Sequence, residues 1–184
     1  MFKSKYKKIL GEINQVLDTV DQSEIDSLLA AVVSANRIVM FGAGRVGMAA
    51  RGFAMRLGHM GFNAYTLGDS TVPSIGVGDL IIIVSGSGET QTVVDIANLA
   101  KQNGSTVFAI TGNSNSRIGK TANSILNLRA PSKTKIQNGW KSEQPMTTLN
   151  EQCLTIMFDS VVLQLMEAKG FTHETMWANH SNLE

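Results

Sequence analysis

An aliphatic run that stops abruptly in small polar residues does most to limit what this chain can fold into. Residues 80–90 read LIIIVSGSGET, five aliphatic side chains followed by alternating serine and glycine. A short run that is apolar at every position predicts a strand buried on both faces, as in the centre of a parallel sheet. The serines and glycines then mark the point where this strand ends and a helix begins.

Segments typical of strands alternate along the chain with segments typical of helices. Strands are expected at 37–41, 63–67, 79–84, 106–111 and 124–128, and helices at 3–20, 21–34, 46–60, 90–102 and 148–169. This alternation is typical of right-handed βαβ units, in which helices cover both faces of a parallel sheet. The fold class is therefore α/β, with a five-stranded parallel sheet.

Length and charge limit the function classes. The chain has 184 residues, a formal net charge of +1 and one cysteine, Cys153. We expect a single domain over 1–184, with a helical segment at 1–36, no disulfide, no membrane span and a cytoplasmic location. The lysines within 3–8 are too few to predict a nucleic-acid partner. The polar stretch 131–147 is long enough to predict a functional or disordered loop.

The first glycine-rich turn follows the first expected strand. Residues 42–47 read GAGRVG, a match to the G-x-G-x-x-G pattern of dinucleotide-binding folds, with Gly42 and Gly44 in the turn. Asp69, after the next strand, is placed where an acidic residue could hold a ribose. An NAD(P)-dependent oxidoreductase is therefore one hypothesis, although Arg45 is unusual in a tight pyrophosphate turn.

The second glycine-rich turn is SGSGET at 85–90. A helix start offers unpaired N–H groups and partial positive charge to a phosphate, and Gly86 and Gly88 let the backbone approach it. Ser85, Ser87 and Thr90 add hydroxyl donors, more than the alternative of an ordinary helix cap requires. No lysine follows, as a triphosphate loop would need, so we expect a sugar phosphate.

Three motifs in order resemble the sugar-isomerase (SIS) domain family: the GAGR loop, SGSGET, and a T-x-x-N-E-Q that opens the long helix. Within it, four stretches are similar to the 6-phospho-3-hexuloisomerases, namely residues 42–69, GDLIIIVSGSGET, QPMTTLNEQ and the terminal ETMWANHSNLE. The chain departs from the family pattern at Val46 (serine in GAGRSG), at Asp69 (usually glutamate), and at Thr147 and Asn150 within QPMGSLFEQ.

This resemblance implies a flavodoxin-like, three-layer αβα sandwich in a homo-oligomer, a tetramer, with no cofactor. It implies interconversion of D-arabino-hex-3-ulose 6-phosphate and fructose 6-phosphate, as in ribulose-monophosphate formaldehyde assimilation. A sugar-phosphate-sensing SIS module without catalysis is the alternative outside the enzymes. Such sensors usually carry a DNA-binding domain, and residues 1–36 are too short and insufficiently basic to supply one.

Glu151 is the candidate base for this reaction. Moving a carbonyl between neighbouring carbons needs one carboxylate that reaches both, through a cis-enediolate. From the residues alone, Thr148-x-x-Glu151 is equally a capping box that closes the start of the long helix. The resemblance places the family's glutamate at Glu151. Arg45 is the candidate for stabilising the enediolate oxygen, with a solvated arginine at a helix start as the alternative.

A histidine is expected to move the hydroxyl proton or to open the sugar ring. His59 ends a helix, where a histidine also suits the helix dipole. His180 lies on the tail 171–184, which we expect to pack at a subunit interface and to reach a neighbouring subunit's site. His59 and His180 are both candidates, and the residues do not divide the two roles between them. The scattered histidines and the single cysteine predict no metal site, and Cys153 is expected to be a core residue.

Overall fold

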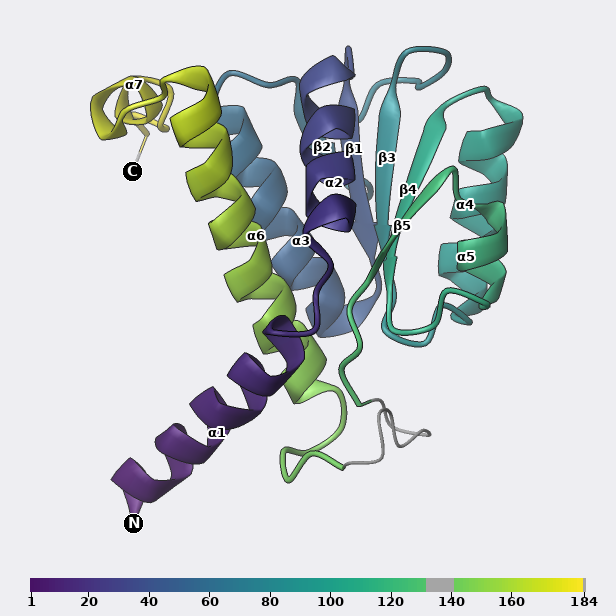
Figure 1. Cartoon of the computed structure of the whole chain (residues 1–184). Coiled ribbons are helices and arrows are strands. Elements are labelled where there is room, and N and C mark those ends of the chain that lie inside the picture. Colours follow the sequence, from purple (N-terminus) through teal and green to yellow (C-terminus); the bar gives the residue numbers. More distant parts are fainter. Residues whose placement is uncertain (132–140, 184) are drawn as a thin grey trace.

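The architecture is an α/β sandwich around one parallel sheet (Figure 1). The structure is a computed structural model that describes residues 1–131 and 141–183. Its strands are β1 (Ile38–Gly42), β2 (Ala64–Thr66), β3 (Leu80–Val84), β4 (Thr106–Thr111) and β5 (Ser124–Asn127). Its helices are α1 (Phe2–Leu17), α2 (Gln22–Ser34), α3 (Gly44–His59), α4 (Gln91–Gln102), α5 (Arg117–Thr121), α6 (Thr148–Lys169) and α7 (His173–Ala178).

The strand order is β2-β1-β3-β4-β5, and every pair of neighbours is parallel. This is the flavodoxin-like order, in which the chain reverses direction across the sheet between β1 and β3. β3 is the central strand and all five of its residues are buried, as the run LIIIV predicts. The predicted fold class is confirmed.

Two apolar cores lie on opposite faces of the sheet, because successive strand side chains point to opposite sides. On β3, Leu80, Ile82 and Val84 pack with α1, α2, α3 and α6. Ile81 and Ile83 pack with α4 and α5 on the other face. Figure 1 shows the same division, with α4 and α5 on one side of the sheet and the remaining large helices on the other.

Local signals explain where the helices begin and end. The Asp21 side chain accepts a hydrogen bond from the Ser23 N–H and caps α2, and Gly170 ends α6 in the left-handed region at φ 71°. Two short helices, α5 and α7, were not predicted, since five or six residues are too few to display a 3.6-residue period. A Thr172–Thr175 capping box begins α7.

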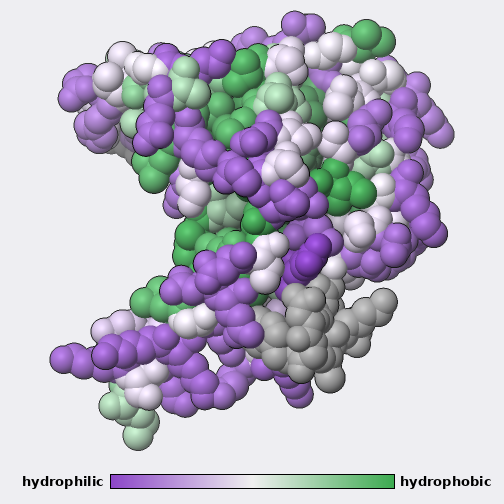
Figure 2. Space-filling model, viewed as in Figure 1, coloured by the Kyte–Doolittle hydropathy of each residue, from purple (hydrophilic) through white to green (hydrophobic). Residues whose placement is uncertain are grey.

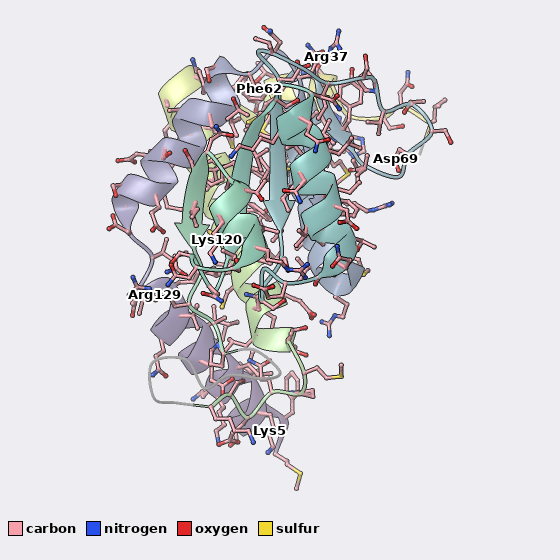
Figure 3. All side chains as sticks on the ribbon, turned by 90° about the vertical axis from the view of Figure 1, so that its right-hand side faces the viewer. Lys5, Arg37, Phe62, Asp69, Lys120 and Arg129 are labelled. Carbon is pink, nitrogen blue, oxygen red and sulfur yellow. The ribbon has the colours of Figure 1, made fainter. Side chains whose placement is uncertain are left out.

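α1 extends away from the body of the molecule. Ile13 and Val16, near its carboxyl end, are buried against α6, whereas Lys5 and its neighbours lie beyond the sheet (Figures 1 and 3). Figure 2 shows a hollow between this arm and the upper part of the molecule, with hydrophobic residues on its wall. Among the described residues, no helix combines the length and apolar character needed to cross a membrane.

The polar stretch 131–147 lies partly outside the described residues, because 132–140 are not among them. Residues 141–147 run from there to the start of α6 and contact α1.

Candidate active site

The two glycine-rich turns lie side by side at the carboxyl edge of the sheet. β1 and β3 are neighbours, with Gly42 in register with Val84, so GAGRVG and SGSGET emerge from adjacent strands. A Cβ added to Gly42 would come within 3.1 Å of the Val84 carbonyl oxygen. This edge, at the reversal between β1 and β3, is where ligands bind in open α/β sheets.

The glycines of the first turn serve backbone packing. A Cβ on Gly47 would lie 2.3 Å from the Gly42 carbonyl oxygen, so only glycine lets α3 start so close to β1. Gly44 adopts φ 62°. Asp69 lies beside α3: its Oδ1 is 3.8 Å from Nη1 of Arg51, in the middle of that helix. Figure 3 shows Asp69 in the half of the molecule that contains Arg37, the residue before β1.

Arg45 and Glu151 form an ion pair at the start of α3 and α6. Nε of Arg45 lies 2.9 Å from Oε2 of Glu151. The Glu151 side chain is only 10% exposed, whereas that of Arg45 is 62% exposed and reaches solvent. A carboxylate this buried needs a partner to offset its lost hydration, and the guanidinium supplies one. The pair places a carboxylate and a cation beside the two turns, as acid–base chemistry on an enediolate requires.

Two threonines complete the surroundings of this pair. The Thr147 hydroxyl donates to Oε1 of Glu151 at 2.7 Å, and Nη1 of Arg45 lies 3.4 Å from the Thr148 hydroxyl oxygen. The alternative role of Glu151 in a Thr148–Glu151 capping box is not seen, since Thr147 is the N-cap of α6 and Thr148 donates to the Pro145 carbonyl. The Glu151 side chain is therefore turned toward Arg45.

The hydroxyls of the second turn have different environments. Ser85 is buried, and its side-chain oxygen accepts a hydrogen bond from the Gly88 N–H at 3.1 Å. This hydrogen bond stabilises the turn. Ser87 and Thr90 are exposed. Thr90 is the N-cap of α4, yet its side chain makes no capping hydrogen bond. The Ser87 oxygen accepts a hydrogen bond from the Glu89 N–H at 3.2 Å, so its O–H can still donate. Both hydroxyls can therefore donate to an anion at the start of α4.

Gly88 and Gly86 fix the position of this turn. Gly88 has φ 69°, and a Cβ there would lie 2.0 Å from the Ser116 hydroxyl oxygen, so it is needed for packing as well as for ligand approach. A Cβ on Gly86 would lie 3.4 Å from the amide of Asn150. Asn150 precedes Glu151 and is buried, so the second turn and the start of α6 lie against each other.

The acidic side chain within the second turn, Glu89, is paired with an arginine. Glu89 Oε2 accepts from Nε of Arg117 at 2.8 Å, and Oε1 accepts from the Arg117 N–H at 3.1 Å. Hydrogen bonds from the Arg117 side chain and then from its N–H lower the pKa of Glu89, against a weak opposing effect of burial. The Arg117 guanidinium therefore compensates a negative charge that would otherwise repel an anion. Sequence reasoning missed it, because nothing in its neighbourhood signals a contact with residues 28 positions earlier.

The histidines lie at the other end of α3. His59 is buried, and its ring centroid is 5.0 Å from that of His180. Nδ2 of Asn179 donates to the His59 carbonyl at 3.0 Å, which ties the C-terminal tail to this end of α3. Within one chain the structure thus groups His59 with His180, and Arg45 with Glu151, but it does not bring the two groups together.

A cleft between α3 and α6 extends from the ion pair. Its volume is about 360 Å³. Arg45 and Glu151 are among its lining residues, and Met48 and Met55 contribute apolar surface from α3. Both methionines are more than half exposed, at 69% and 53%. An apolar surface of this kind is typical of contact with another protein chain.

No metal site is found in the part of the chain that the structure describes. Its histidine, cysteine, aspartate and glutamate side chains form no group of three placed to hold an ion. Cys153 is buried in the core, and burial raises the pKa of its thiol to about 12. A thiol protonated at physiological pH is a poor nucleophile, so Cys153 is a packing residue.

A flavodoxin-like sheet with two glycine-rich turns at its carboxyl edge is typical of α/β proteins that bind a phosphorylated ligand there. Residues 31–156 match the model of the SIS domain, and the chain belongs to the SIS domain family. The resemblance noted in the sequence is thereby confirmed.

Relatives named 3-hexulose-6-phosphate isomerase match most of this chain. The one from Bacillus subtilis is 42% identical, over 96% of this chain and 96% of its own length. The one from Mycobacterium gastri is 35% identical, over 93% and 87%. A solved structure from Methanococcus jannaschii superposes on this chain with a TM-score of 0.82 at 30% identity. The superposition covers 97% of this chain and 96% of that one, and a function of 3-hexulose-6-phosphate isomerase was inferred from that structure.

Proposed function

We propose that the chain is a phosphosugar isomerase that interconverts D-arabino-hex-3-ulose 6-phosphate and fructose 6-phosphate. The observation that carries the proposal is the buried Glu151 carboxylate, paired with Arg45 at 2.9 Å beside a hydroxyl-rich helix start. Relatives named for this activity at up to 42% identity support it. The oxidoreductase hypothesis has less support, since these relatives are named for isomerisation.

In the proposed reaction, Glu151 takes the proton from C2 of the 3-ketose. The electron pair left on C2 forms the C2–C3 double bond of a cis-enediolate, and the C3 carbonyl becomes an oxyanion. Arg45 stabilises this oxyanion. A proton moves from O2 to O3, and Glu151 returns its proton to C3, which leaves the carbonyl at C2. No redox partner is needed, and one carboxylate serves both carbons.

The phosphate of the substrate binds at the second turn in this proposal. Ser87 and Thr90 donate their exposed hydroxyls, and the first N–H groups of α4 face the same anion. Because Gly86 contacts Asn150, a sugar held by its phosphate here extends toward Glu151.

A complete site in this proposal needs a second copy of the chain. Arg45 and His59 are 14 residues apart on α3, or about 21 Å at 1.5 Å per residue. Gly52 lies midway, is exposed, and a Cβ there would meet nothing within 4 Å. A twofold axis crossing α3 near Gly52 would align two α3 helices antiparallel and bring one copy's His59, with His180, beside the other copy's Arg45.

The C-terminal tail and the exposed methionines of the cleft would lie in this interface. The tetramer implied by the resemblance requires a further contact, for which the projecting α1 is available (Figure 1). We place the enzyme in the cytoplasm, in ribulose-monophosphate formaldehyde assimilation, and propose no cofactor.

The direct test is to incubate the protein with hex-3-ulose 6-phosphate and couple fructose 6-phosphate formation to a dehydrogenase. Glu151→Gln should lower kcat by about 1000-fold or more while substrate binding is nearly retained. Glu167→Gln, an exposed position on the same helix, is the matched control and should behave as wild type. Normal turnover by Glu151→Gln would show that the base is another residue, and a wild type that binds the sugar without converting it would indicate a sensor.

Mixing two inactive variants tests the shared site. Glu151→Gln and His59→Gln chains, refolded together, should regain about a quarter of wild-type activity, because half of random dimers are mixed and each mixed dimer has one intact site. If the mixture stays inactive although mixed oligomers form, His59 does not act across an interface.

A further inference from the structure

Glu12 on α1 binds the segment that leads into α6. Its carboxylate accepts three hydrogen bonds: from the Ser142 hydroxyl at 2.7 Å, from the Glu143 N–H at 2.8 Å, and from the Gln144 side-chain amide at 3.0 Å. Lys8, one turn earlier on α1, forms an ion pair with the Glu143 side chain. Residues 142–144 are thus held by one carboxylate that lies about 130 positions away in sequence.

The charged form of Glu12 is the one that the segment stabilises. Burial works to raise the pKa of Glu12, but the hydrogen bonds from Glu143, Ser142 and Gln144, together with Lys8, outweigh it and lower the pKa. Glu12 is therefore a carboxylate at neutral pH, with acceptor lone pairs for all three donors.

The residue that follows this segment is held in an uncommon conformation. Met146 has φ 58°, and it is the one residue other than glycine with a positive φ among those the structure describes. A left-handed backbone at a methionine persists when the surrounding structure fixes both of its sides. Glu12 fixes one side through residues 142–144. On the other side, the Thr148 hydroxyl donates to the Pro145 carbonyl.

The same short stretch ends at the ion pair of the candidate active site. Thr147 donates to Oε1 of Glu151 at 2.7 Å, and Thr148 lies 3.4 Å from Nη1 of Arg45. Only two residues separate Gln144 from Thr147. A displacement of the segment would therefore move the hydroxyls that orient both members of the pair.

We propose that Glu12 is a positioning residue for the reaction centre: its carboxylate fixes residues 142–144, and through Thr147 and Thr148 it orients Glu151 and Arg45. The proposal rests on the function proposed above for Glu151. It assigns the N-terminal helix a part in the chemistry, although Glu12 itself touches neither the substrate nor the reacting atoms.

The first test is kinetic. Glu12→Gln keeps the shape of the side chain but replaces one acceptor oxygen by an NH₂ group, which faces donors. We expect kcat to fall about 10-fold with KM within about 2-fold of wild type, since a small misplacement of a reacting group affects turnover more than binding. Thr147→Val should lower kcat similarly. The double variant should be no worse than the poorer single variant, because both changes break the same path.

The second test is hydrogen–deuterium exchange, which does not depend on activity. Glu12→Gln should speed exchange in 141–147 and in the first turn of α6, whereas Glu167→Gln should change neither. Ser142→Ala, which removes one of the three donors and leaves α1 intact, should act in the same direction more weakly; it also serves if Glu12→Gln folds poorly.

Two outcomes would overturn the proposal. In the first, the losses of kcat from Glu12→Gln and Thr147→Val multiply in the double variant. In the second, Glu12→Gln speeds hydrogen exchange in 141–147 but not in the first turn of α6. A wild-type chain without isomerase activity would overturn the proposed function instead, while the exchange data would still decide whether Glu12 holds the start of α6.

Discussion

The two glycine-rich turns have similar sequences but use their residues differently. In GAGRVG, the close approach of Gly47 to the Gly42 carbonyl brings α3 against β1 and directs Arg45 to Glu151. In SGSGET, the buried Ser85 and the close packing of Gly88 on Ser116 shape a turn whose remaining hydroxyls face solvent. The first turn thus orients a side chain toward a buried carboxylate, and the second leaves hydroxyl groups exposed at the start of a helix.

This difference shows why a glycine pattern alone identifies no ligand. Both turns follow a strand and precede a helix, where either a dinucleotide or a phosphate can bind. The distinction comes from the residues between the glycines and from their partners on distant elements, Glu151 for the first turn and Arg117 for the second.

The largest effect is expected at the first turn. Arg45→Met should lower kcat about 100- to 1000-fold through loss of oxyanion stabilisation, with a smaller change in KM. Arg51→Met, on the same helix and also beside a carboxylate, is the control and should retain activity. Steady-state kinetics measure both variants. A rise in KM without loss of kcat in Arg45→Met would assign Arg45 to substrate binding, and the two turns would then not differ in role.

The packing difference between the turns can be tested with a matched pair of glycines. Gly88→Ala should destabilise the protein by about 3 kcal/mol, because both a positive φ and a clash with Ser116 oppose the new Cβ. Gly44→Ala has a similar φ but no atom within 4 Å of the Cβ, and should cost about 1 kcal/mol. Urea denaturation compares the two, and equal losses would mean that the backbone conformation alone matters.

At the second turn, loss of hydroxyls should weaken binding. Ser87→Ala combined with Thr90→Ala should raise KM about 10- to 100-fold while kcat changes less than about 3-fold, since hydrogen bonds to a charged group are lost in ground and transition states alike. Ser70→Ala with Thr71→Ala, an exposed pair on another loop, is the control. Unchanged affinity of the Ser87→Ala, Thr90→Ala variant for the substrate would show that the phosphate does not bind at this turn.

The smallest effect is expected at Glu89. The contact with Arg117 lowers the pKa of Glu89 in the folded protein from its ordinary value of 4.5. The contact therefore stabilises the folded protein at pH values above 4.5, and this stabilisation is lost as the pH falls through the pKa of Glu89 in the folded protein. Wild type should unfold a few degrees at most above Glu89→Gln at neutral pH, and this difference should shrink below pH 4.5. Thermal unfolding at several pH values measures it. A difference that grows in acid would contradict the sign.

The sequence predicted the sheet well because its signals are local. The aliphatic β3 run, the Asp21 cap and the αL glycine after α6 each act within a few residues, so the ends of most elements agree within one or two positions. The helices α5 and α7 were not predicted because they are too short to show a helical period. The pairing of Arg45 with Glu151 joins residues 106 positions apart. It depends on how α6 packs on α3, which no local pattern specifies.

The site was predicted unevenly for the same reason. From the residues alone, Glu151 could be a base or close a capping box. The structure has Thr147, one residue earlier than expected, at the N-cap of α6 and shows no such box, and the base role stays a prediction. Glu12 gave no signal, since a single glutamate among lysines on an amphipathic helix is ordinary. That the candidate histidines meet the carboxylate across an interface between two chains stays a prediction.

The position of α1 has a consequence for how turnover could be altered. The match to the SIS domain model covers residues 31–156, so Glu12 and all of α1 lie outside it, although the relative from Bacillus subtilis matches 96% of this chain. Both glycine turns and Glu151 lie inside this match. If Glu12 holds the start of α6, shortening α1 is a way to change turnover through residues that lie outside the matched region.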